Sequence, residues 1–426
     1  MDFAAMMKAL MDERGLGVRA LAGRVPCDKA LISRLANGRE RPSRQMARRL
    51  DEALGAGGRL ASAAAAMAPP GARGGMEDDE DPVRRREFAG LAGASLFSAV
   101  LAGPAAGGLA GAVESFAAAL AAGTPAPAGE PDLAALAGQV AAAKRGYQAC
   151  RYADVIREMP GLLARLGGAA AALGGDERLR AYALSAEAHH VAASVLLKLG
   201  EHGLAPLAAD RSMQAARASE DPLAAGCGAR IVTHALMAGG HLGAAVTTAR
   251  SVAARLDTTA RPADGESLSV YGALLLRGAI AAAQDGNRGT AGELLGEAGE
   301  AGRRLGTDAN LRWTAFGPAN VAVHKVSIAV MLGDAGTAVD TARTIDLDQL
   351  AVTERKAALL VETARAFLMW GKHEKAYTVL RAAEQLAPAE VAAPAPRQVA
   401  RDLAATAPPS LRRHARDFAA RVQASQ

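Results

Sequence analysis

The sequence predicts an all-α protein in which a small helical domain is followed by a long series of helical hairpins. Half of its 426 residues are hydrophobic, but only 3% are aromatic. Alanine is the main apolar residue, and it has the highest intrinsic helix propensity. The alternation of apolar and polar residues that is typical of strands is nearly absent. A short turn motif also recurs in the C-terminal part, between segments of helical character.

Residues 1–60 form the predicted N-terminal domain, which consists of short helices joined by tight turns. Their apolar residues are spaced so that the helices share one small core, built from Leu10, Leu16, Leu21, Val25, Leu31, Ile32, Leu35, Met46, Leu50 and Leu54. The segment carries twelve Lys or Arg and seven Asp or Glu, whereas the rest of the chain is close to neutral in sum. This uneven charge is expected if the N-terminal domain alone contacts phosphate.

The same segment resembles the Xre/Cro/C1 repressor family over roughly its first 55 residues. The residues that match the family pattern, in order, are Leu10, Arg14, Gly15, Leu16, Leu21, Ala22, Ile32, Ser33, Leu35, Asn37, Gly38 and Pro42. Gly17 stands where the family usually has a Ser or Thr helix cap, and Ala36 stands where it usually has Glu. The resemblance implies a helix-turn-helix that binds double-stranded DNA, usually as a homodimer on half-sites about one helical turn apart.

The predicted recognition helix follows Asp28, which is placed to cap it or to lie in its first turn. Recognition helices contact base edges with their N-terminal residues. We therefore expect contacts to DNA bases from Lys29, Ala30, Ser33 and Arg34. Lys29 and Arg34 suit guanine O6 and N7, and Ala30 suits a thymine methyl group. Phosphate contacts are expected around the helix exit, from Asn37, Arg39, Arg41 and Arg44. The alternative is that some of these arginines only keep the surface solvated.

A linker is predicted over residues 61–131, with a short apolar helix near 85–120. Its proline, glycine and acidic residues do not favour a packed core. Residues 84–103 resemble a twin-arginine export signal, but a whole domain precedes them. The run is also shorter than the ~20 apolar residues needed to span a bilayer. We therefore expect a helix that packs against the C-terminal domain, and export or membrane insertion is the less favoured alternative.

One turn motif occurs six times after residue 132, in Cys150–Val155, Gly200–Ala205, Gly240–Ala245, Gly286–Ala291, Gly333–Ala338 and Gly371–Ala376. Its first residue suits the left-handed position that ends a helix. Its last residue is small, which suits a point where the second helix approaches the first closely. These copies resemble tetratricopeptide repeats. We therefore predict a helical-hairpin, tetratricopeptide-like solenoid over residues 132–426, with capping helices at its C-terminal end.

Stacked helical hairpins form a concave face that suits an extended peptide or a small molecule. The segment 310–324 holds one of the two tryptophans of the chain, and it places Asn320 and His324 on one helix face. The candidate effector-binding residues are Tyr271, Arg277, Trp313, Asn320 and His324. The alternative is that Trp313 and Phe316 belong to the core and that His324 is an interior histidine. His189, His190 and His234 are weaker candidates.

The two-part organisation resembles regulators, of an actinobacterial type, that change their DNA binding when they sense a signalling peptide. The sequence thus predicts a sequence-specific transcriptional regulator whose solenoid senses a peptide or small-molecule effector or mediates dimerisation. The alternative is an adaptor whose solenoid recruits a protein partner, with DNA binding only as an anchor.

No enzyme is predicted, because phosphate-loop, G-x-S-x-G and H-E-x-x-H motifs are absent from the sequence. Cys27, Cys150 and Cys227 lie far apart, so the sequence indicates no disulfide framework and no metal or other cofactor. This cysteine usage fits a reducing, cytoplasmic setting.

Overall fold

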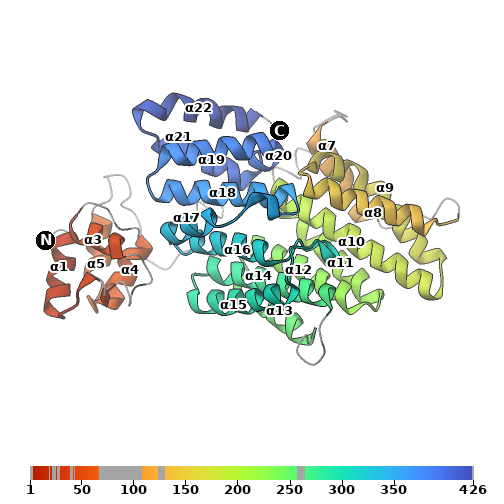
Figure 1. Ribbon diagram of the computed structural model, residues 1–426, viewed down its shortest axis with the longest axis horizontal. Helices are drawn as coiled ribbons and strands as arrows, with labels where there is room; N and C mark the ends of the chain where they lie inside the picture. Colours follow the sequence, from red (N-terminus) through yellow and green to blue (C-terminus); the bar gives the residue numbers. More distant parts are fainter. Residues whose placement is uncertain are drawn as a thin grey trace. The chain divides into compact units, whose positions relative to one another are not determined.

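The computed structural model describes residues 3–66, except 19, 22–24, 26–28, 39–41 and 43, together with residues 108–122, 130–256 and 264–424. These residues form helices, turns and loops, and no strand occurs among them. The chain divides into two compact units, Met1–Gly93 and Ala94–Gln426 (Figure 1). The predicted all-α class, with a short N-terminal unit followed by many packed helices, is confirmed.

The described helices of the N-terminal unit surround one core, and they are α1 (Phe3–Glu13), α3 (Lys29–Ala36), α4 (Arg44–Ala53) and α5 (Arg59–Ala66). The predicted core residues that are buried are Leu10, Leu21, Val25, Ile32, Leu35, Leu50 and Leu54. Leu16 and Met46 are half-buried at the edge of this core, and the Leu31 side chain lies outside the described residues. Phe3 and Met7 of α1 are also fully buried, although the sequence pattern did not identify them.

The N-terminal unit extends beyond the predicted boundary at residue 60. Leu60 is fully buried in its core, so α5 (Arg59–Ala66) belongs to this unit. The Asp51 carboxylate in α4 accepts hydrogen bonds from the backbone N–H groups of Gly58, Leu60 and Ala61, at 2.6, 2.7 and 3.1 Å. A carboxylate from another helix thus satisfies the free N–H groups at the start of α5.

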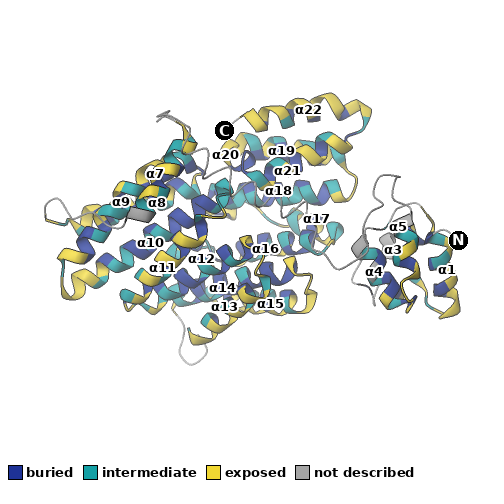
Figure 2. Cartoon of the chain, turned by 180° about the vertical axis from the view of Figure 1, so that it is seen from behind, coloured by how far each residue is buried: buried dark blue, intermediate teal, exposed yellow. Residues whose placement is uncertain are grey.

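In the C-terminal unit, residues 130–256 and 264–424 contain six helical hairpins. Their first helices are α8 (Leu133–Gln148), α10 (Gly175–Leu199), α12 (Pro222–Ala238), α14 (Gly265–Gln284), α16 (Pro318–Met331) and α18 (Thr353–Met369). Their second helices are α9 (Tyr152–Ala172), α11 (Ala205–Ala218), α13 (Leu242–Arg255), α15 (Arg288–Leu305), α17 (Ala335–Arg343) and α19 (His373–Leu386). Figure 2 shows that the buried residues lie where neighbouring helices face one another.

The predicted turn motif joins the two helices of each hairpin. Its first residue has a left-handed backbone, with φ between 58° and 83°, in all six copies: Cys150, Gly200, Gly240, Gly286, Gly333 and Gly371. Its last residue is at most 4% exposed in each copy: Val155, Ala205, Ala245, Ala291, Ala338 and Ala376. Small side chains at these points let the helices of one hairpin approach closely, which explains how a core with few aromatic residues is filled.

The first helices lie side by side in chain order, and the last of them returns to the first. Each contacts the first helix of the next hairpin, from α8 through to α18. Helix α18 also contacts α8, and its Ala357 is buried in the same core cluster as Val155 and Leu196. The hairpins therefore wind around a central space that their first helices enclose.

A buried ionic cluster joins the second hairpin to the end of the array, and so connects the hairpins that the winding brings together. Lys198 of α10 lies 2.7 Å from the Glu354 carboxylate of α18 and 2.5 Å from the Glu390 carboxylate of α20 (Pro388–Val391). The Tyr152 hydroxyl donates to Glu390 at 2.6 Å, and Arg355 also pairs with Glu354. Both glutamates are less than 5% exposed. Burial alone would raise the pKa of Glu354, but Arg355 and Lys198 hold it below its usual value.

Three further helices complete the C-terminal unit. Helix α7 (Leu109–Ala122) lies within the predicted linker, yet Phe116 is fully buried and the helix packs on α9. Helices α21 (Pro394–Thr406) and α22 (Pro409–Ala424) follow the last hairpin, where capping helices are predicted. The rest of the predicted linker, residues 67–107, includes the export-like run 84–103 and lies outside the described residues. No described helix is long and apolar enough to cross a membrane.

Replacing Ala245 by leucine should destabilise the hairpin of α12 and α13. The added side chain has no space at this fully buried position, so the free energy of unfolding should fall by about 1–3 kcal/mol. Its neighbour Ala244 is exposed, and Ala244→Leu is the matched control, with an expected change within about 0.5 kcal/mol. Unfolding followed by circular dichroism measures both, and equal stability of the two variants would contradict this role of the turn motif.

Replacing Lys198 by methionine should leave the buried carboxylates of Glu354 and Glu390 without their shared partner. Removing one member of a buried ion pair costs about 3–5 kcal/mol of the free energy of unfolding. The double variant Lys198→Met/Glu390→Gln should have a higher free energy of unfolding than Lys198→Met alone, because it no longer contains the unpaired charge of Glu390. Thermal unfolding of the two variants distinguishes these cases, and equal losses would show that charge pairing does not hold the winding closed.

Candidate functional site

Helix α3 presents one face to the core of the N-terminal unit and the other face outward. Ile32 and Leu35 are fully buried, whereas Ser33 is half-buried and Arg34 is exposed. Lys29 and Ala30 occupy the first turn of α3, but their side chains lie outside the described residues. The described part of α3 thus places Ser33 and Arg34 on the side away from the core, as contacts to DNA bases require.

Of the four predicted phosphate-contacting residues, only Asn37, which directly follows α3, is described with its side chain. Asn37 is exposed, and its side-chain amide donates to the Ser33 carbonyl at 2.8 Å. Lys8 of α1 donates to the Asn37 side-chain oxygen at 3.1 Å. Arg39 and Arg41 lie outside the described residues, and Arg44 begins α4 with a side chain that is not described.

Lys8 is a cation that the sequence pattern did not place near the recognition helix. It is exposed, and the packing of α1 against α3 brings its ammonium group to the exit of that helix. Lys8 is not itself a residue of the family pattern, so only the tertiary contact with Asn37 could identify it.

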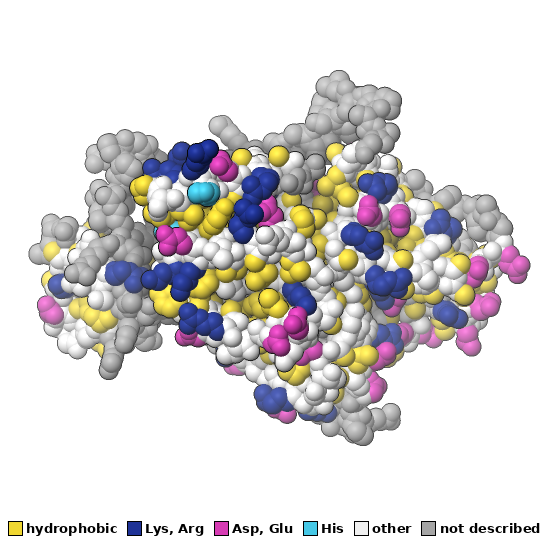
Figure 3. All heavy atoms as spheres, turned by 45° about the horizontal axis from the view of Figure 1, so that its top comes forward, with side chains coloured by type: hydrophobic (Ala, Val, Ile, Leu, Met, Phe, Trp, Pro, Cys, Tyr) yellow, Lys and Arg dark blue, Asp and Glu magenta, His cyan; other side chains and the backbone are white. Residues whose placement is uncertain are grey.

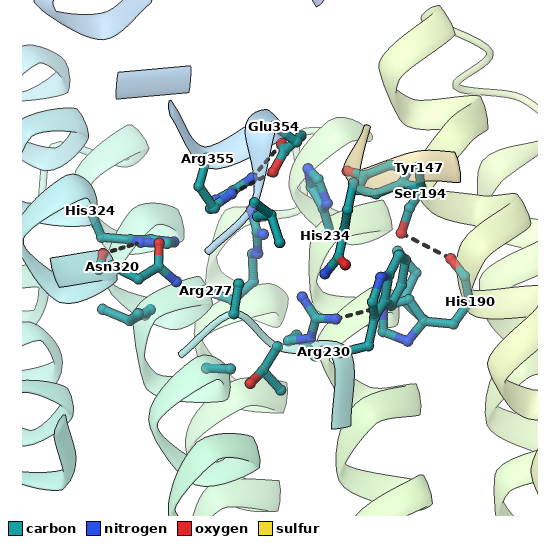
Figure 4. A pocket seen from close by; sticks show the side chains of 18 residues that line it. Tyr147, His190, Ser194, Arg230, His234, Arg277, Asn320, His324, Glu354 and Arg355 are labelled. Atoms are coloured by element: carbon teal, nitrogen blue, oxygen red, sulfur yellow. Dashed lines mark hydrogen bonds and ion pairs between the residues drawn. The ribbon is translucent and has the colours of Figure 1, made fainter. Parts of the chain in front are cut away.

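A cavity of about 50 Å³ lies at the centre of the C-terminal unit (Figure 4). Every one of the six first helices contributes to its lining, through Tyr147, His190, Arg230, Arg277, Asn320 and Arg355 in chain order. The loop between α15 and α16 adds Trp313. The cavity therefore depends on the winding of the six hairpins around one common axis, which brings all of their first helices to the same central space.

Four of the five predicted effector-binding residues line this cavity, namely Arg277, Trp313, Asn320 and His324. Tyr271 is the exception, because its hydroxyl donates to Glu297 of α15. Tyr271 and Arg277 are six positions apart on α14, so the two side chains leave the helix on different sides. His190 and His234 line the cavity, whereas His189 instead contacts the Ser185 carbonyl at 2.9 Å.

The two aromatic residues of segment 310–324, Trp313 and Phe316, lie in different environments. Phe316 is fully buried in the core, where its ring fills the space beside Gly272. It is therefore a core residue, as the alternative interpretation of the sequence predicts. Trp313 is half-buried and lines the cavity. Its ring makes edge contacts with Tyr147 and His190, each at a centroid distance of 5.2 Å.

The loop that carries Trp313 is held in a strained conformation. Arg312, Trp313 and Ala315 all have left-handed backbone angles, with φ between 49° and 60°, and such residues cost about 1 kcal/mol or more each. The Arg312 guanidinium bridges Asp221 and Glu266 at 2.8 and 2.7 Å. These ion pairs tie the loop to the starts of α12 and α14, and so keep Trp313 against the cavity.

A second tie joins this loop to the first hairpin. The side-chain amides of Gln148 and Asn310 exchange two hydrogen bonds, at 3.0 and 2.9 Å. The Trp313 indole N–H also donates to the Lys144 carbonyl at 3.3 Å. The loop between the fourth and fifth hairpins is therefore anchored to α8 across the cavity.

Three arginines give the cavity its charge. Arg355 is paired with Glu354, but Arg230 and Arg277 have no carboxylate partner among the described residues. Arg230 donates instead to the His190 ring nitrogen Nε2 at 3.0 Å. Burial and the nearby charges of Arg230 and Arg355 lower the pKa of Arg277 to about 10.

The histidines of the cavity are uncharged at neutral pH. Burial is the main cause that lowers the pKa values of His190, His234 and His324, and neighbouring arginines lower them further. The His324 pKa falls to about 3, and its Nδ1–H donates to the Asn320 carbonyl at 2.9 Å. Two buried polar atoms in the cavity wall have no hydrogen-bond partner, the side-chain oxygen of Asn320 and Nε of Arg230.

Residues 2–64 match a protein family described as a helix-turn-helix domain. This match covers α1 through most of α5, and hence the whole described core of the N-terminal unit. No curated protein matches the chain, and no solved structure matches it. In the part of the chain that the structure describes, no group of three or more His, Cys, Asp or Glu residues is placed to hold a metal ion.

The buried histidines should make the C-terminal unit less stable in acid. His324 takes up a proton near pH 6.5 when unfolded but only near pH 3 when folded, so unfolding binds a proton between these values. The free energy of unfolding should therefore fall with decreasing pH below 6.5, by up to about 1.4 kcal/mol per pH unit for one such histidine.

Thermal unfolding of the full chain between pH 7 and pH 4 tests this expectation. His324→Gln removes the titrating group, so its midpoint temperature should depend less steeply on pH than that of the wild type. His202→Gln is the matched control, because His202 is exposed. An unchanged slope in His324→Gln would mean that His324 does not contribute to acid sensitivity.

Proposed function

We propose that the protein is a sequence-specific, DNA-binding transcriptional regulator whose C-terminal unit senses an effector in its central cavity. The observation that carries the DNA-binding part is the helix-turn-helix match over residues 2–64. The orientation of α3 supports it, because Ile32 and Leu35 face the core while Arg34 is exposed. In this proposal Lys29 and Arg34 read bases, and Lys8 joins the residues that contact phosphate.

The distribution of charge supports a division of labour between the two units. The excess of Lys and Arg lies in residues 1–60, and the rest of the chain is nearly neutral. Figure 3 shows basic and acidic side chains interspersed on the C-terminal unit, without a broad basic patch on that face. The N-terminal unit is therefore the part suited to DNA. A homodimer is part of the proposal, since helix-turn-helix proteins commonly bind two half-sites.

The composition of the cavity supports the sensing role. Beside apolar residues such as Leu276 and Val352, the cavity wall contains arginine, histidine, asparagine and glutamate side chains. Buried polar groups without partners are unfavourable unless something compensates for them. A bound effector is such a compensation, and it would contact helices from every hairpin.

The adaptor function remains a second candidate because the C-terminal unit also has an open groove. This groove, of about 750 Å³, lies along α11, α12 and α13 and includes the apolar residues Met213, Val252 and Leu256. Such a groove suits a partner segment with an apolar face. The adaptor function predicts that DNA binding is weak and unselective.

Selection of duplexes from a random-sequence pool, followed by fluorescence anisotropy over a series of salt concentrations, tests the DNA-binding function. The wild type should enrich one sequence. The double substitution Lys29→Ala/Arg34→Ala should weaken binding to it by at least about tenfold, because two base contacts are lost.

A control variant removes the same charge elsewhere. Arg180 and Lys372 are exposed residues of the C-terminal unit, and Arg180→Ala/Lys372→Ala should leave the affinity unchanged. If no sequence is enriched, and all three proteins bind any duplex with equal and weak affinity, the regulator is excluded in favour of the adaptor.

A further inference from the structure

We infer that the central cavity binds a small anion, a molecule whose carboxylate or phosphate group lies between Arg230 and Arg277. This inference names the chemical class of the effector and, in that respect, rests on the proposed function. The anion site itself is defined by the geometry of the C-terminal unit and can be tested without DNA.

The first argument is an imbalance of buried charge. Four cationic side chains meet at the centre of the unit, those of Arg230, Arg277, Arg355 and Lys198. Among the described residues, the carboxylates that pair with these cations are those of Glu354 and Glu390; both contact Lys198, and Glu354 also pairs with Arg355. Because Arg230 and Arg277 lack carboxylate partners among the described residues, the cluster keeps an excess of positive charge that an anion would neutralise.

The second argument is the arrangement of donors. The guanidinium groups of Arg230 and Arg277 come from adjacent first helices, α12 and α14, and Figure 4 shows both reaching into the same cavity. Paired guanidinium groups match the two oxygens of a carboxylate or the three of a phosphate. The His190 ring accepts from Arg230 at 3.0 Å, and burial lowers the pKa values of His190, His234 and His324, which favours their uncharged forms.

The third argument is the unsatisfied hydrogen-bonding capacity of the wall. Asn320 is only 3% exposed, and its side-chain oxygen has no partner. The Arg230 Nε–H, which can donate, is also unpartnered. Buried polar atoms are nearly always satisfied in folded proteins. A ligand that accepts from Arg230 and donates a hydroxyl or amine hydrogen to Asn320 would satisfy both.

The size of the cavity limits the ligand. A volume of about 50 Å³ holds only a few water molecules or a small organic anion, and not an extended peptide. Trp313 and Tyr147 form an aromatic wall beside the charged groups. The ligand is therefore a compact molecule with one strongly anionic group and little additional bulk.

The position of the site gives the anion a means to act on the whole unit. Arg230, Arg277 and Arg355 belong to three different hairpins and repel one another when the cavity holds no anion. Neutralising them favours the closed winding over any more open arrangement. Anion binding should thus stabilise the C-terminal unit as a whole.

Thermal unfolding of the full chain tests the site with two probes, sodium phosphate and sodium succinate, against sodium chloride at equal ionic strength. At least one probe should raise the midpoint temperature of the wild type in a concentration-dependent way. A response to phosphate alone identifies a phosphoryl ligand, and a response to succinate identifies a carboxylate. If neither probe exceeds chloride, the proposal is overturned.

Substitutions then locate the effect. Calorimetric titration with the effective probe should show an affinity at least about thirtyfold weaker in Arg277→Gln, because one partner of a buried charged contact is lost. Asn320→Ala should weaken it as well, and the exposed control Arg180→Gln should not. An unchanged affinity in Arg277→Gln would overturn the proposal.

Two further variants keep the outcome interpretable. Arg277→Met removes an unpaired buried charge, so without anion it should unfold at the same or a higher temperature than the wild type while losing the response to the probe. Lys29→Ala/Arg34→Ala should retain the response, which excludes phosphate binding at the N-terminal unit. No DNA is present in these measurements, so a failure of the anion site is separate from a failure of DNA binding.

Discussion

The contact of Lys198 with Glu354 and Glu390 is the constraint on which the rest of the C-terminal unit depends. It joins α10 of the second hairpin to α18 and α20 at the end of the array. An array of helical hairpins contacts only its neighbours, and its concave face is open. Here the ends meet, and Glu354, which takes part in this contact, also lines the central cavity together with its neighbour Arg355.

Closure of the array changes how the charged side chains on the inner face of the hairpins are solvated. In an open array, arginines on that face would be solvated and would need no partner. In this unit Arg230 and Arg277 are half-buried, and burial lowers the pKa of both, so local groups or a ligand that compensate their charge are favoured. The strained loop around Trp313 adds to this enclosure, because it is anchored to α8, α12 and α14. Charge, strain and enclosure therefore coincide at one place, as they commonly do at functional sites.

The two units fill their cores with different apolar residues. In the hairpins, alanine at the turn motif permits close helix packing and leaves the inner faces free for polar side chains. In the N-terminal unit, leucine, isoleucine and phenylalanine fill a compact core, and the exposed face of α3 is left for charged and polar residues. Each unit separates the residues that stabilise it from those that suit a ligand, which allows one face to vary without loss of the fold.

The sequence by itself determined the features that depend on local periodicity. The helical class, the six left-handed turns, the buried small residues after them and most of the N-terminal core all follow from residues close together in the chain. The pairing of Asn320 with His324 on α16 belongs to the same group, because a four-residue spacing defines one helix face.

Only the tertiary structure decided which of these faces meet. It brings Lys198 to Glu354 and Glu390, places Arg230 and Arg277 in one cavity, and excludes Tyr271 from it. It also places α5 in the core of the N-terminal unit and brings Lys8 to the end of α3. These contacts join residues far apart in the chain, and they depend on how the helices pack and how far the hairpins wind. No local pattern encodes that winding, because it is the sum of small rotations between successive hairpins.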